Sequence, residues 1–298
     1  MVLPFRFGVN LTTPAARTQW IEKCRRAETL GYDVIAVPDH LGLPAPFPAL
    51  MLAADVTERP RLTTFVLNAP FYNPVLLARD VAGLDQFTGG RFELGLGSGY
   101  VRAEFDAAGI PFPSAGERVT HLEKTVATLR RLFGDPGYKP QPTRPGGPPL
   151  MIAGWGERSL RLAAEHADIV AFTGAGAAES GLLTFADAET SAKKTDYVRG
   201  LLAAAGGENR AGAVEFNLLV QGIVAPSERA AATAYLPKHL PFDFSGAIED
   251  LPVILIGTAA EMADALRERR ERFGFNYISV LEHNMDRLAP LIELLHGE

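Results

Sequence analysis

The sequence predicts an α/β fold, a (β/α)8 TIM barrel with loop insertions. Eight short apolar runs alternate with longer segments of helical periodicity within 298 residues. The alternation continues to the C-terminus without a domain break, and several apolar runs end in polar or glycine-rich turns. We therefore expect one barrel domain over residues 1–298, and an open, doubly wound sheet is the competing arrangement.

The expected strands are short apolar runs, most of which end in polar or glycine-containing turns. In the first expected helix, Trp20, Cys24 and Ala27 recur at helical intervals, and Pro74 is well placed to start the second. The expected strands cover residues 5–10, 33–40, 62–68, 91–99, 149–154, 168–174, 214–224 and 277–282. The expected helices cover 15–30, 74–87, 117–133, 157–166 and 259–273, with a last one that ends in LAPLIELL.

Three further segments are interpreted as loops. The proline- and glycine-rich stretch at 134–149 is a loop and not a linker, because strand-like sequence resumes in phase after it. Residues 174–190 and 236–256 are expected to be insertions above or beside the active face of the barrel.

Composition excludes several classes of protein. The chain is 47% hydrophobic and 21% charged, which is ordinary for a globular protein in water. Its net charge is −6 and no run of Lys and Arg exceeds two, so we expect no nucleic-acid partner and no membrane partner. We see no signal peptide and no 18-residue apolar span, and expect a cytoplasmic protein. The single cysteine, Cys24, excludes a disulfide framework, and no spacing of ligands suggests a metal site.

The rule that barrel chemistry lies at the C-terminal ends of the strands turns the expected strands into candidate sites. The polar or glycine-rich ends are Asp39-His40, Asn68, Gly97 to Tyr100, Gly154 to Gly156, Thr173-Gly174, Gln221 and Glu282-His283. Asp39 and His40 are the best acid–base candidates, although an isolated histidine is more often a structural hydrogen-bonding group. His121 and His166 fall within expected helices and are interpreted as structural.

Two glycine-rich turns could serve a ligand. In GRFELGLGSGY a dinucleotide fingerprint would need glycine at position 100, where the chain has Tyr100, so the glycines indicate a tight turn that leaves room beside a ligand. In AGWGERS a strand joins a helix, whose free N–H groups could bind a phosphate. An ordinary strand-to-helix turn is the alternative, and Arg158 could assist an anion or be solvated.

Three stretches resemble the luciferase-like flavin and deazaflavin barrel superfamily: AETLGYDVIAVPDHL, TTFVLNAPFYNPVLLARDVAGLDQFTGGRFELGLGSGYVRAEFDAAGIPF and MIAGWGERSLRLAAEHADIV. The segment LDQFTGGRFELGLGSGY carries the most specific part of the likeness. The resemblance covers residues 5–173 well and the last third loosely. Within the superfamily the chain is most similar to the branch of coenzyme F420-dependent oxidoreductases.

The resemblance implies that coenzyme F420 or FMN lies across the C-terminal face, with its ring near strands two to four and its phosphate after strand five. His40 would be the proton partner of a hydride transfer, with Asp39 beside it, and a non-proline cis peptide is expected near Thr64-Phe65. The implied cofactor-binding residues are Asp39, His40, Thr64, Phe65, Asn68, Gly97, Ser98, Ala153, Gly154, Trp155 and Gly156.

One residue departs from the family pattern. Deazaflavin-dependent sugar-phosphate and alcohol dehydrogenases of this superfamily carry glutamate directly after the glycines of strand four, where this chain has Tyr100. Sugar-phosphate dehydrogenation is therefore disfavoured, and Tyr100 would either donate a proton or stack on the substrate. Glu104, four residues on, is expected to lie too far along the chain to replace the missing acid.

The leading hypothesis is an oxidoreductase that uses coenzyme F420 for hydride transfer to or from a small, hydrophobic organic substrate. The alternative is an FMN-dependent monooxygenase that uses reduced flavin and O2. A non-catalytic flavin-binding barrel is a third reading, and an aldolase-type barrel is set aside because no expected strand ends in lysine. Residues 41–50, 174–190 and 236–256 would form the substrate pocket, and the resemblance implies a homodimer.

Overall fold

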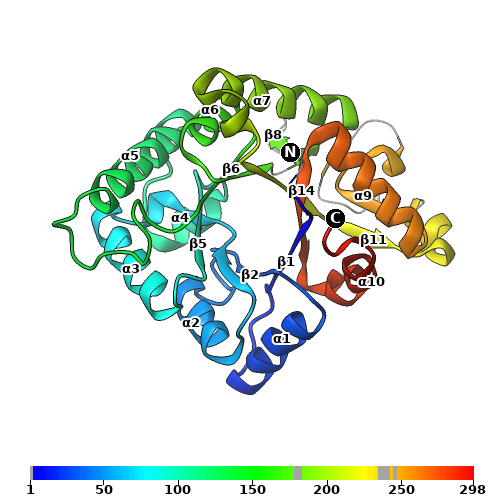
Figure 1. The fold of residues 1–298 in the computed structure, drawn as a ribbon, viewed down its shortest axis with the longest axis horizontal. Coiled ribbons are helices and arrows are strands. Elements are labelled where there is room, and N and C mark those ends of the chain that lie inside the picture. The colour runs from blue at the N-terminus through cyan, green and yellow to red at the C-terminus, as the bar shows by residue number, and fades with distance from the viewer. Residues whose placement is uncertain (1–2, 173, 178–182, 234–241, 244–246) are drawn as a thin grey trace.

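The computed structural model describes residues 3–172, 174–177, 183–233, 242–243 and 247–298. Its centre is a closed barrel of parallel strands, because β1 pairs with β14 and β3 pairs with β5, so that neither end of the sheet is left open (Figure 1). The barrel strands are β1 (Arg6–Asn10), β2 (Val34–Val37), β3 (Arg61–Thr64), β5 (Phe92–Gly97), β6 (Leu150–Gly154), β7 (Ile169–Phe172), β10 (Glu215–Val220) and β14 (Phe275–Leu281). The predicted TIM barrel is confirmed.

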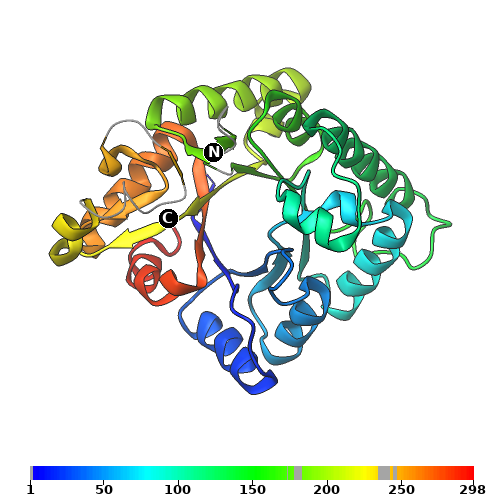
Figure 2. The same ribbon diagram turned by 180° about the vertical axis from the view of Figure 1, so that it is seen from behind.

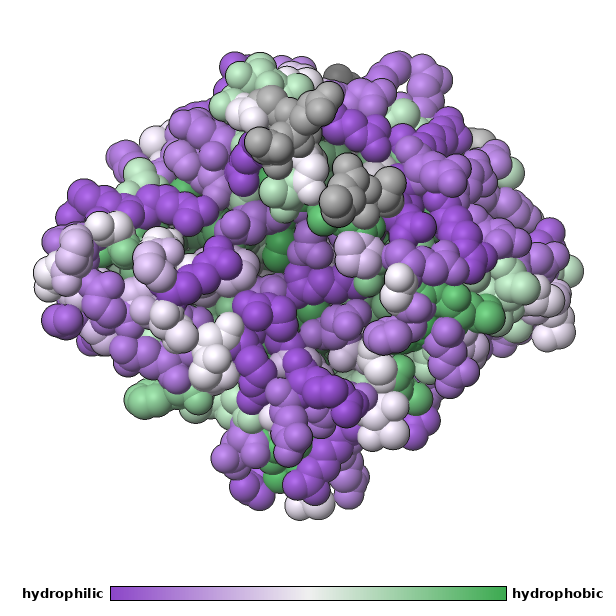
Figure 3. Space-filling model, viewed as in Figure 1, coloured by the Kyte–Doolittle hydropathy of each residue, from purple (hydrophilic) through white to green (hydrophobic). Residues whose placement is uncertain are grey.

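Helices surround the barrel on all sides, as the two end-on views show (Figures 1 and 2). They are α1 (Arg17–Thr29), α2 (Pro46–Val56), α3 (Pro74–Phe87), α4 (Arg102–Ala108), α5 (Ala115–Phe133), α6 (Glu157–His166), α7 (Ala188–Ala211), α9 (Ala259–Phe273) and α10 (Met285–Leu295). Apolar faces of these helices, such as Trp20, Cys24 and Ala27 of α1, are buried together with the outward side chains of the strands. The face seen in Figure 3 is largely hydrophilic. In the part of the chain that the structure describes, no helix is long and apolar enough to cross a membrane.

Short polar motifs in the sequence fix where several helices begin. The Asn73 side chain accepts hydrogen bonds from the N–H groups of Val75 and Leu76, which caps α3 directly before Pro74. Ser114 and Glu117 form a reciprocal capping box at the start of α5. These capping groups fix the start of α3 at Pro74, as expected, and the start of α5 at Ala115, two residues before the expected start.

Four expected segments differ from the observed elements. The strand expected at 62–68 is interrupted, because β3 ends at Thr64 and β4 (Leu67–Asn68) resumes after a turn. The cis peptide bond joins Phe65 to Val66, one residue beyond the expected position. The strand expected at 214–224 divides after Val220, and β11 (Gly222–Val224) leaves the barrel to pair with β13 (Ile254–Ile256). The segment 41–50, expected to help form the substrate pocket, contains the start of α2.

The two expected insertions contain short elements of their own. In 174–190, β8 (Ala175–Ala177) and β9 (Leu183–Phe185) pair with each other and β9 also pairs with β12 (Phe242–Asp243). The second insertion holds β12, the 3-10 turn η3 (Ile248–Asp250) and β13, while its YLPKH stretch lies outside the described residues. The remaining 3-10 turns are η1 (Ala69–Phe71), η2 (Pro226–Glu228) and η4 (Glu282–Asn284).

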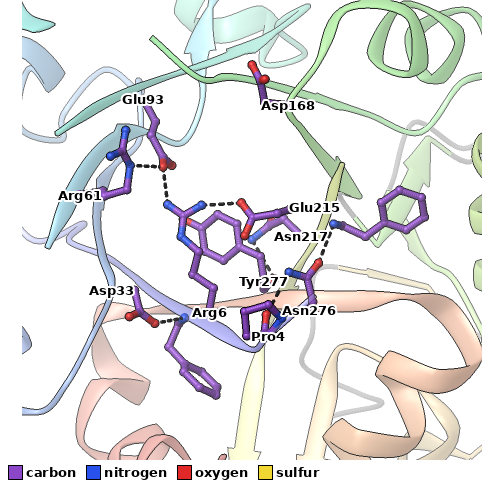
Figure 4. A network of polar contacts seen from close by, with 12 residues as sticks. Pro4, Arg6, Asp33, Arg61, Glu93, Asp168, Glu215, Asn217, Asn276 and Tyr277 are labelled. Atoms are coloured by element: carbon purple, nitrogen blue, oxygen red, sulfur yellow. Dashed lines mark hydrogen bonds and ion pairs between the residues drawn. The ribbon is translucent and has the colours of Figure 1, made fainter. Parts of the chain in front are cut away.

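A cluster of charged side chains fills the N-terminal end of the barrel (Figure 4). Arg6 lies between Glu93 and Glu215, with 2.5 Å from its Nη1 atom to the Oε2 atom of Glu215. Arg61 also binds Glu93, and the guanidinium of Arg6 lies 4.7 Å from the ring centre of Tyr277. These residues stand at or near the first positions of their strands, so the cluster occupies the end of the barrel opposite the strand ends predicted to carry chemistry.

Candidate active site

His40 and Glu104 form the central polar contact at the C-terminal end of the barrel. His40 follows β2, and Glu104 lies in the first turn of α4, the short helix that follows β5. The Nδ1 atom of His40 and the Oε1 atom of Glu104 are 2.8 Å apart, and the two side chains are 33% and 13% exposed. The pair thus combines a partly accessible imidazole with a largely buried carboxylate.

Glu104 was expected to lie too far along the chain to replace the missing acid, and the structure brings its carboxylate into contact with His40. Helix α4 begins at Arg102, directly after the turn that ends β5, and its first turn carries Glu104 back to the end of β2. The sequence signal that was missed is the helix itself, RAEFDAA, which ends at Gly109 with a φ of +67°. Residues from two separate strand ends therefore meet although they are 64 positions apart.

Asp39 points to a different set of partners. Its Oδ2 atom accepts a hydrogen bond of 2.9 Å from the backbone N–H of Asn68, and its carboxylate also bonds the Tyr72 hydroxyl. Burial raises the pKa of Asp39, and the hydrogen bonds from Asn68 and Tyr72 oppose part of that rise. Burial together with the nearby Asp39 carboxylate also raises the pKa of Tyr72. Asp39 thus anchors the chain just after the interruption between β3 and β4.

The raised pKa of Asp39 gives a pH-dependent stability. Because folding disfavours the ionised carboxyl, the stability that Asp39 contributes is greatest below its unfolded pKa and falls as the pH rises through its folded pKa. Asp39→Asn should keep an acceptor for the Asn68 N–H and remove this titration. We expect the unfolding free energy of the variant relative to wild type to increase from pH 4 to pH 7 in urea titrations. A difference that stays constant or decreases over that range would contradict the assignment.

Tyr100 lies beside His40 at the mouth of the barrel. Its side chain is 60% exposed, and its ring meets the imidazole edge-to-face with 5.9 Å between the ring centres. Partial burial of the hydroxyl and then the Glu104 carboxylate raise the pKa of Tyr100. The three predicted catalytic residues thus follow β2 and β5, which β3 separates in the barrel, and the rings of His40 and Tyr100 are in contact.

Asn68 has an amide oxygen that the described residues leave without a partner. The side chain is 6% exposed, and its Oδ1 atom makes no hydrogen bond within the described part of the chain. A Cβ atom on Gly99, which has a φ of +72°, would lie 2.1 Å from that oxygen. Glycine at this position is therefore required both by the backbone angle and by the close approach of the amide. A buried amide oxygen without a partner is a feature that a bound molecule could satisfy.

Gly95 and Gly97 of β5 leave space for the neighbouring segment between β3 and β4. Thr64 is fully buried, and its hydroxyl donates to the carbonyl and accepts from the N–H of Gly95, both at 2.9 Å. A Cβ atom on Gly95 would lie 1.9 Å from the carbonyl oxygen of Thr64, and one on Gly97 would lie 2.8 Å from Val66. The Thr64 hydroxyl is therefore used within the barrel wall, while Phe65 packs toward the barrel interior.

The turn after β6 supplies the second polar feature. Ala153 and Gly154 end the strand, and Gly156 is the N-cap of α6 with no side chain bonded to the first N–H groups of the helix. Trp155 is half-buried and packs edge-to-face against Phe172 at 6.5 Å between ring centres. These four consecutive residues thus join the end of β6 to the start of α6, where the sequence predicts either an anion-binding turn or an ordinary strand-to-helix turn.

Arg158 turns away from this helix end. It bonds Glu123 and Thr120 of α5 together with the carbonyl of Gly116. Its guanidinium therefore joins α6 to α5 and is not directed at an anion beside Gly156.

The remaining strand ends serve the fold. Glu282, after β14, accepts hydrogen bonds from the N–H groups of Thr12 and Thr13 and pairs with Lys23. The backbone N–H of Gln221 donates to Val253 at 2.7 Å. Ser98, after β5, is half-buried, and Thr173 lies outside the described residues. The His40–Glu104 pair and the glycine-rich turn of the candidate site thus lie at the ends of β2, β5 and β6, whereas these other strand ends make contacts within the fold.

Comparison of the sequence with known proteins identifies two kinds of relative. The chain is 38% identical over 119 residues to the F420-dependent glucose-6-phosphate dehydrogenase of Intrasporangium calvum, a match that covers 36% of each chain. It is 30% identical over 133 residues to the 4-hydroxyprotoasukamycin monooxygenase of Streptomyces nodosus subsp. asukaensis, covering 43% of this chain and 34% of that one. The chain thus spans about a third of the length of these two curated relatives.

Solved structures show the same fold over nearly the whole chain. An F420-dependent secondary alcohol dehydrogenase aligns with a TM-score of 0.74, and the F420-dependent tetrahydromethanopterin reductase of Methanopyrus kandleri with 0.76. Both are 17% identical and cover 98% of each chain. A family model described as luciferase-like monooxygenase matches residues 1–277. The chain belongs to the luciferase-like monooxygenase family, as the resemblance predicted.

Proposed function

We propose that this chain is an oxidoreductase that uses coenzyme F420 for hydride transfer to or from a small, hydrophobic organic substrate. The observation that carries the proposal is the pairing of His40 with Glu104 at the C-terminal end of the barrel, next to strand ends suited to a ring and a phosphate. The F420-dependent relatives support it. The monooxygenase relative supports the second candidate, an FMN-dependent monooxygenase at the same site.

The residues at the strand ends fit a cofactor of this type. The unpartnered amide oxygen of Asn68 offers a hydrogen-bond acceptor, and the uncapped N-terminus of α6 at Gly156 offers N–H donors for a phosphate. Phe65, at the interruption of β3, and Trp155 offer apolar surfaces. When bound, the deazaflavin would supply or accept the hydride, which no side chain of this site can do.

The protein would supply the proton that accompanies the hydride. His40 is 33% exposed, which leaves its ring within reach of a substrate oxygen or nitrogen. Its Nδ1 atom already contacts Glu104, so Nε2 is the ring atom available for proton exchange. Tyr100 shields one side of the imidazole from water and presents an aromatic surface to the substrate.

The surroundings of His40 favour an uncharged substrate. Leu41, which follows His40 in the chain, is 54% exposed, and Tyr100, whose ring contacts the imidazole, is 60% exposed. Arg118, which reaches this region, is engaged by the carbonyl oxygens of Gly99 and Pro113. The apolar surface and the engaged cation support an organic carbonyl or olefin in preference to a sugar phosphate.

Titration of the purified protein with F420 and, in parallel, with FMN tests the choice of cofactor. We expect absorbance and fluorescence changes that saturate with F420 at a dissociation constant at least tenfold below that for FMN. Tight binding of FMN with no binding of F420 would overturn the first candidate and support the monooxygenase.

Gly156 provides a test of the phosphate position. Its φ of −74° and the open space around it accept any side chain, so Gly156→Asp should fold and even cap α6. Its carboxylate would compete with a phosphate for the N–H groups and repel it, so we expect the dissociation constant of F420 to rise about tenfold or more. Gly156→Ser is the uncharged control and should have a clearly smaller effect. Equal effects of Asp and Ser would place the phosphate elsewhere.

A further inference from the structure

We propose that Glu104 is a positioning residue for His40: its carboxylate accepts a hydrogen bond from the Nδ1–H of the ring and thereby makes Nε2 the atom that exchanges a proton with the substrate. The inference rests on the proposed function for its role in turnover. The tautomer of His40 depends only on the contact between these two side chains, so it can be measured without any cofactor.

The contact itself determines the expected tautomer. An ionised carboxylate only accepts hydrogen bonds, so a neutral imidazole 2.8 Å away must carry its proton on Nδ1. A neutral histidine has one protonated nitrogen, and Nε2 is then left as a base. In solution the other tautomer, with the proton on Nε2, is the usual form, so the carboxylate reverses the default preference.

Glu104 is held in place by its neighbour in the chain. Phe105 is fully buried, with its ring 4.8 Å from that of Phe71 and 4.9 Å from that of Phe112. This aromatic contact fixes the first turn of α4 against the barrel, so the carboxylate at position 104 is directed at His40 by a packed backbone. Asp106, two residues on, is instead exposed and pairs loosely with Arg102 at 3.5 Å.

The other groups around the histidine do not compete for this role. Asp39 is engaged by Asn68 and Tyr72, and Tyr100 meets the ring through its edge. Within the described residues, Glu104 is thus the acid bonded to His40.

The assignment gives each direction of the reaction a balanced proton step. In reduction of a carbonyl, a bound reduced deazaflavin would supply the hydride for the new C–H bond, and the Nε2–H of the imidazolium would supply the proton for the new O–H bond. The histidine would then be neutral, with its proton on Nδ1 facing Glu104. In oxidation of an alcohol, a bound oxidised deazaflavin would accept the hydride from carbon, the neutral Nε2 would receive the hydroxyl proton, and Glu104 would stabilise the imidazolium that forms.

Nitrogen NMR of protein labelled with 15N-histidine tests the tautomer directly, read at the high-pH plateau of a pH series. The signal of His40 is assigned by its loss in His40→Gln. We expect a protonated Nδ1 and an unprotonated Nε2 in the wild type and in Glu104→Gln, whose amide oxygen can still accept. In Glu104→Ala the Nε2–H form should become the major one. A wild type with Nε2–H, or a tautomer that Glu104→Ala leaves unchanged, would overturn the inference.

Kinetics separates positioning from binding, with Asp106→Asn as the matched control on the same helix. We expect Glu104→Ala to lower kcat about 10- to 100-fold while the dissociation constant of F420 changes less than twofold. Asp106→Asn should leave both unchanged. If Glu104→Ala lowers kcat no more than Asp106→Asn, the positioning role is wrong. A protein that binds neither F420 nor FMN would instead contradict the proposed function, while the NMR result would still decide the tautomer.

Discussion

Replacing His40 with glutamine should lower kcat of the cofactor-dependent reaction about 10²- to 10⁴-fold, the range that general acid–base catalysis contributes. Glutamine retains hydrogen-bonding capacity and roughly the length of the side chain, so the fold and cofactor binding should persist. The loss arises because His40 is the imidazole that the structure places beside Tyr100 and Glu104, and glutamine cannot exchange a proton in its place. Single-turnover kinetics with reduced F420 and a panel of unsaturated ketones measures the effect.

His283 provides the matched control for this experiment. It also follows a barrel strand, β14, and its Nε2 atom lies 3.0 Å from the amide nitrogen of Asn284. His283→Gln should retain activity close to wild type. The catalytic assignment fails if His40→Gln keeps more than a tenth of the wild-type rate, or if the two variants lose activity equally.

Gly95→Ala should destabilise the protein by at least about 3 kcal/mol, at the upper end of the cost of overpacking a core. The added methyl group would lie 1.9 Å from the carbonyl oxygen of Thr64, and backbone atoms cannot move aside as a flexible side chain can. The same shift would break the paired hydrogen bonds between Gly95 and the Thr64 hydroxyl. Urea unfolding, followed by circular dichroism, measures the change.

Gly83→Ala is the control for this substitution. Gly83 lies inside α3, and no atom lies within 4 Å of the position of its added methyl group. Because alanine favours a helix interior, this variant should be about 0.5 to 1 kcal/mol more stable than wild type. A Gly95→Ala protein as stable as wild type would show that the strand interruption does not need the glycine.

Long, strongly patterned segments could be predicted from the sequence with accuracy. The helices expected at 157–166 and 259–273 match α6 and α9 at both ends, since both have a buried apolar face and α9 also has the Thr258–Glu261 capping box. Residue pattern alone does not show the interruption of the third strand, because the residues on both sides of Phe65 and Val66 are favourable in strands, and the cis peptide there was expected only from the family resemblance. The break depends on space provided by Gly95 and Gly97 of another strand, which is a tertiary effect.

The sequence likewise predicted only part of the candidate site, namely His40 and not its partner Glu104. His40 could be placed from the rule that chemistry lies at strand ends, because the strand and its polar end are adjacent in sequence. Its partner Glu104 could not, because α4 has only seven residues and too few turns to show a periodic pattern. The role of Asp39 was also hidden, since its bonds to Asn68 and Tyr72 join segments that only the folded barrel brings together.

We propose that this barrel transfers a hydride between F420 and an organic substrate, with His40 supplying the proton. Reduced F420 that carries deuterium at the hydride position, incubated with the protein and an unsaturated ketone, tests this proposal most directly by mass spectrometry of the product. We expect one deuterium on carbon in the product with wild-type protein, and a product yield lower by about 10²-fold or more with His40→Gln. A product without deuterium, or oxygen from labelled O2 incorporated when reduced FMN replaces F420, would contradict it.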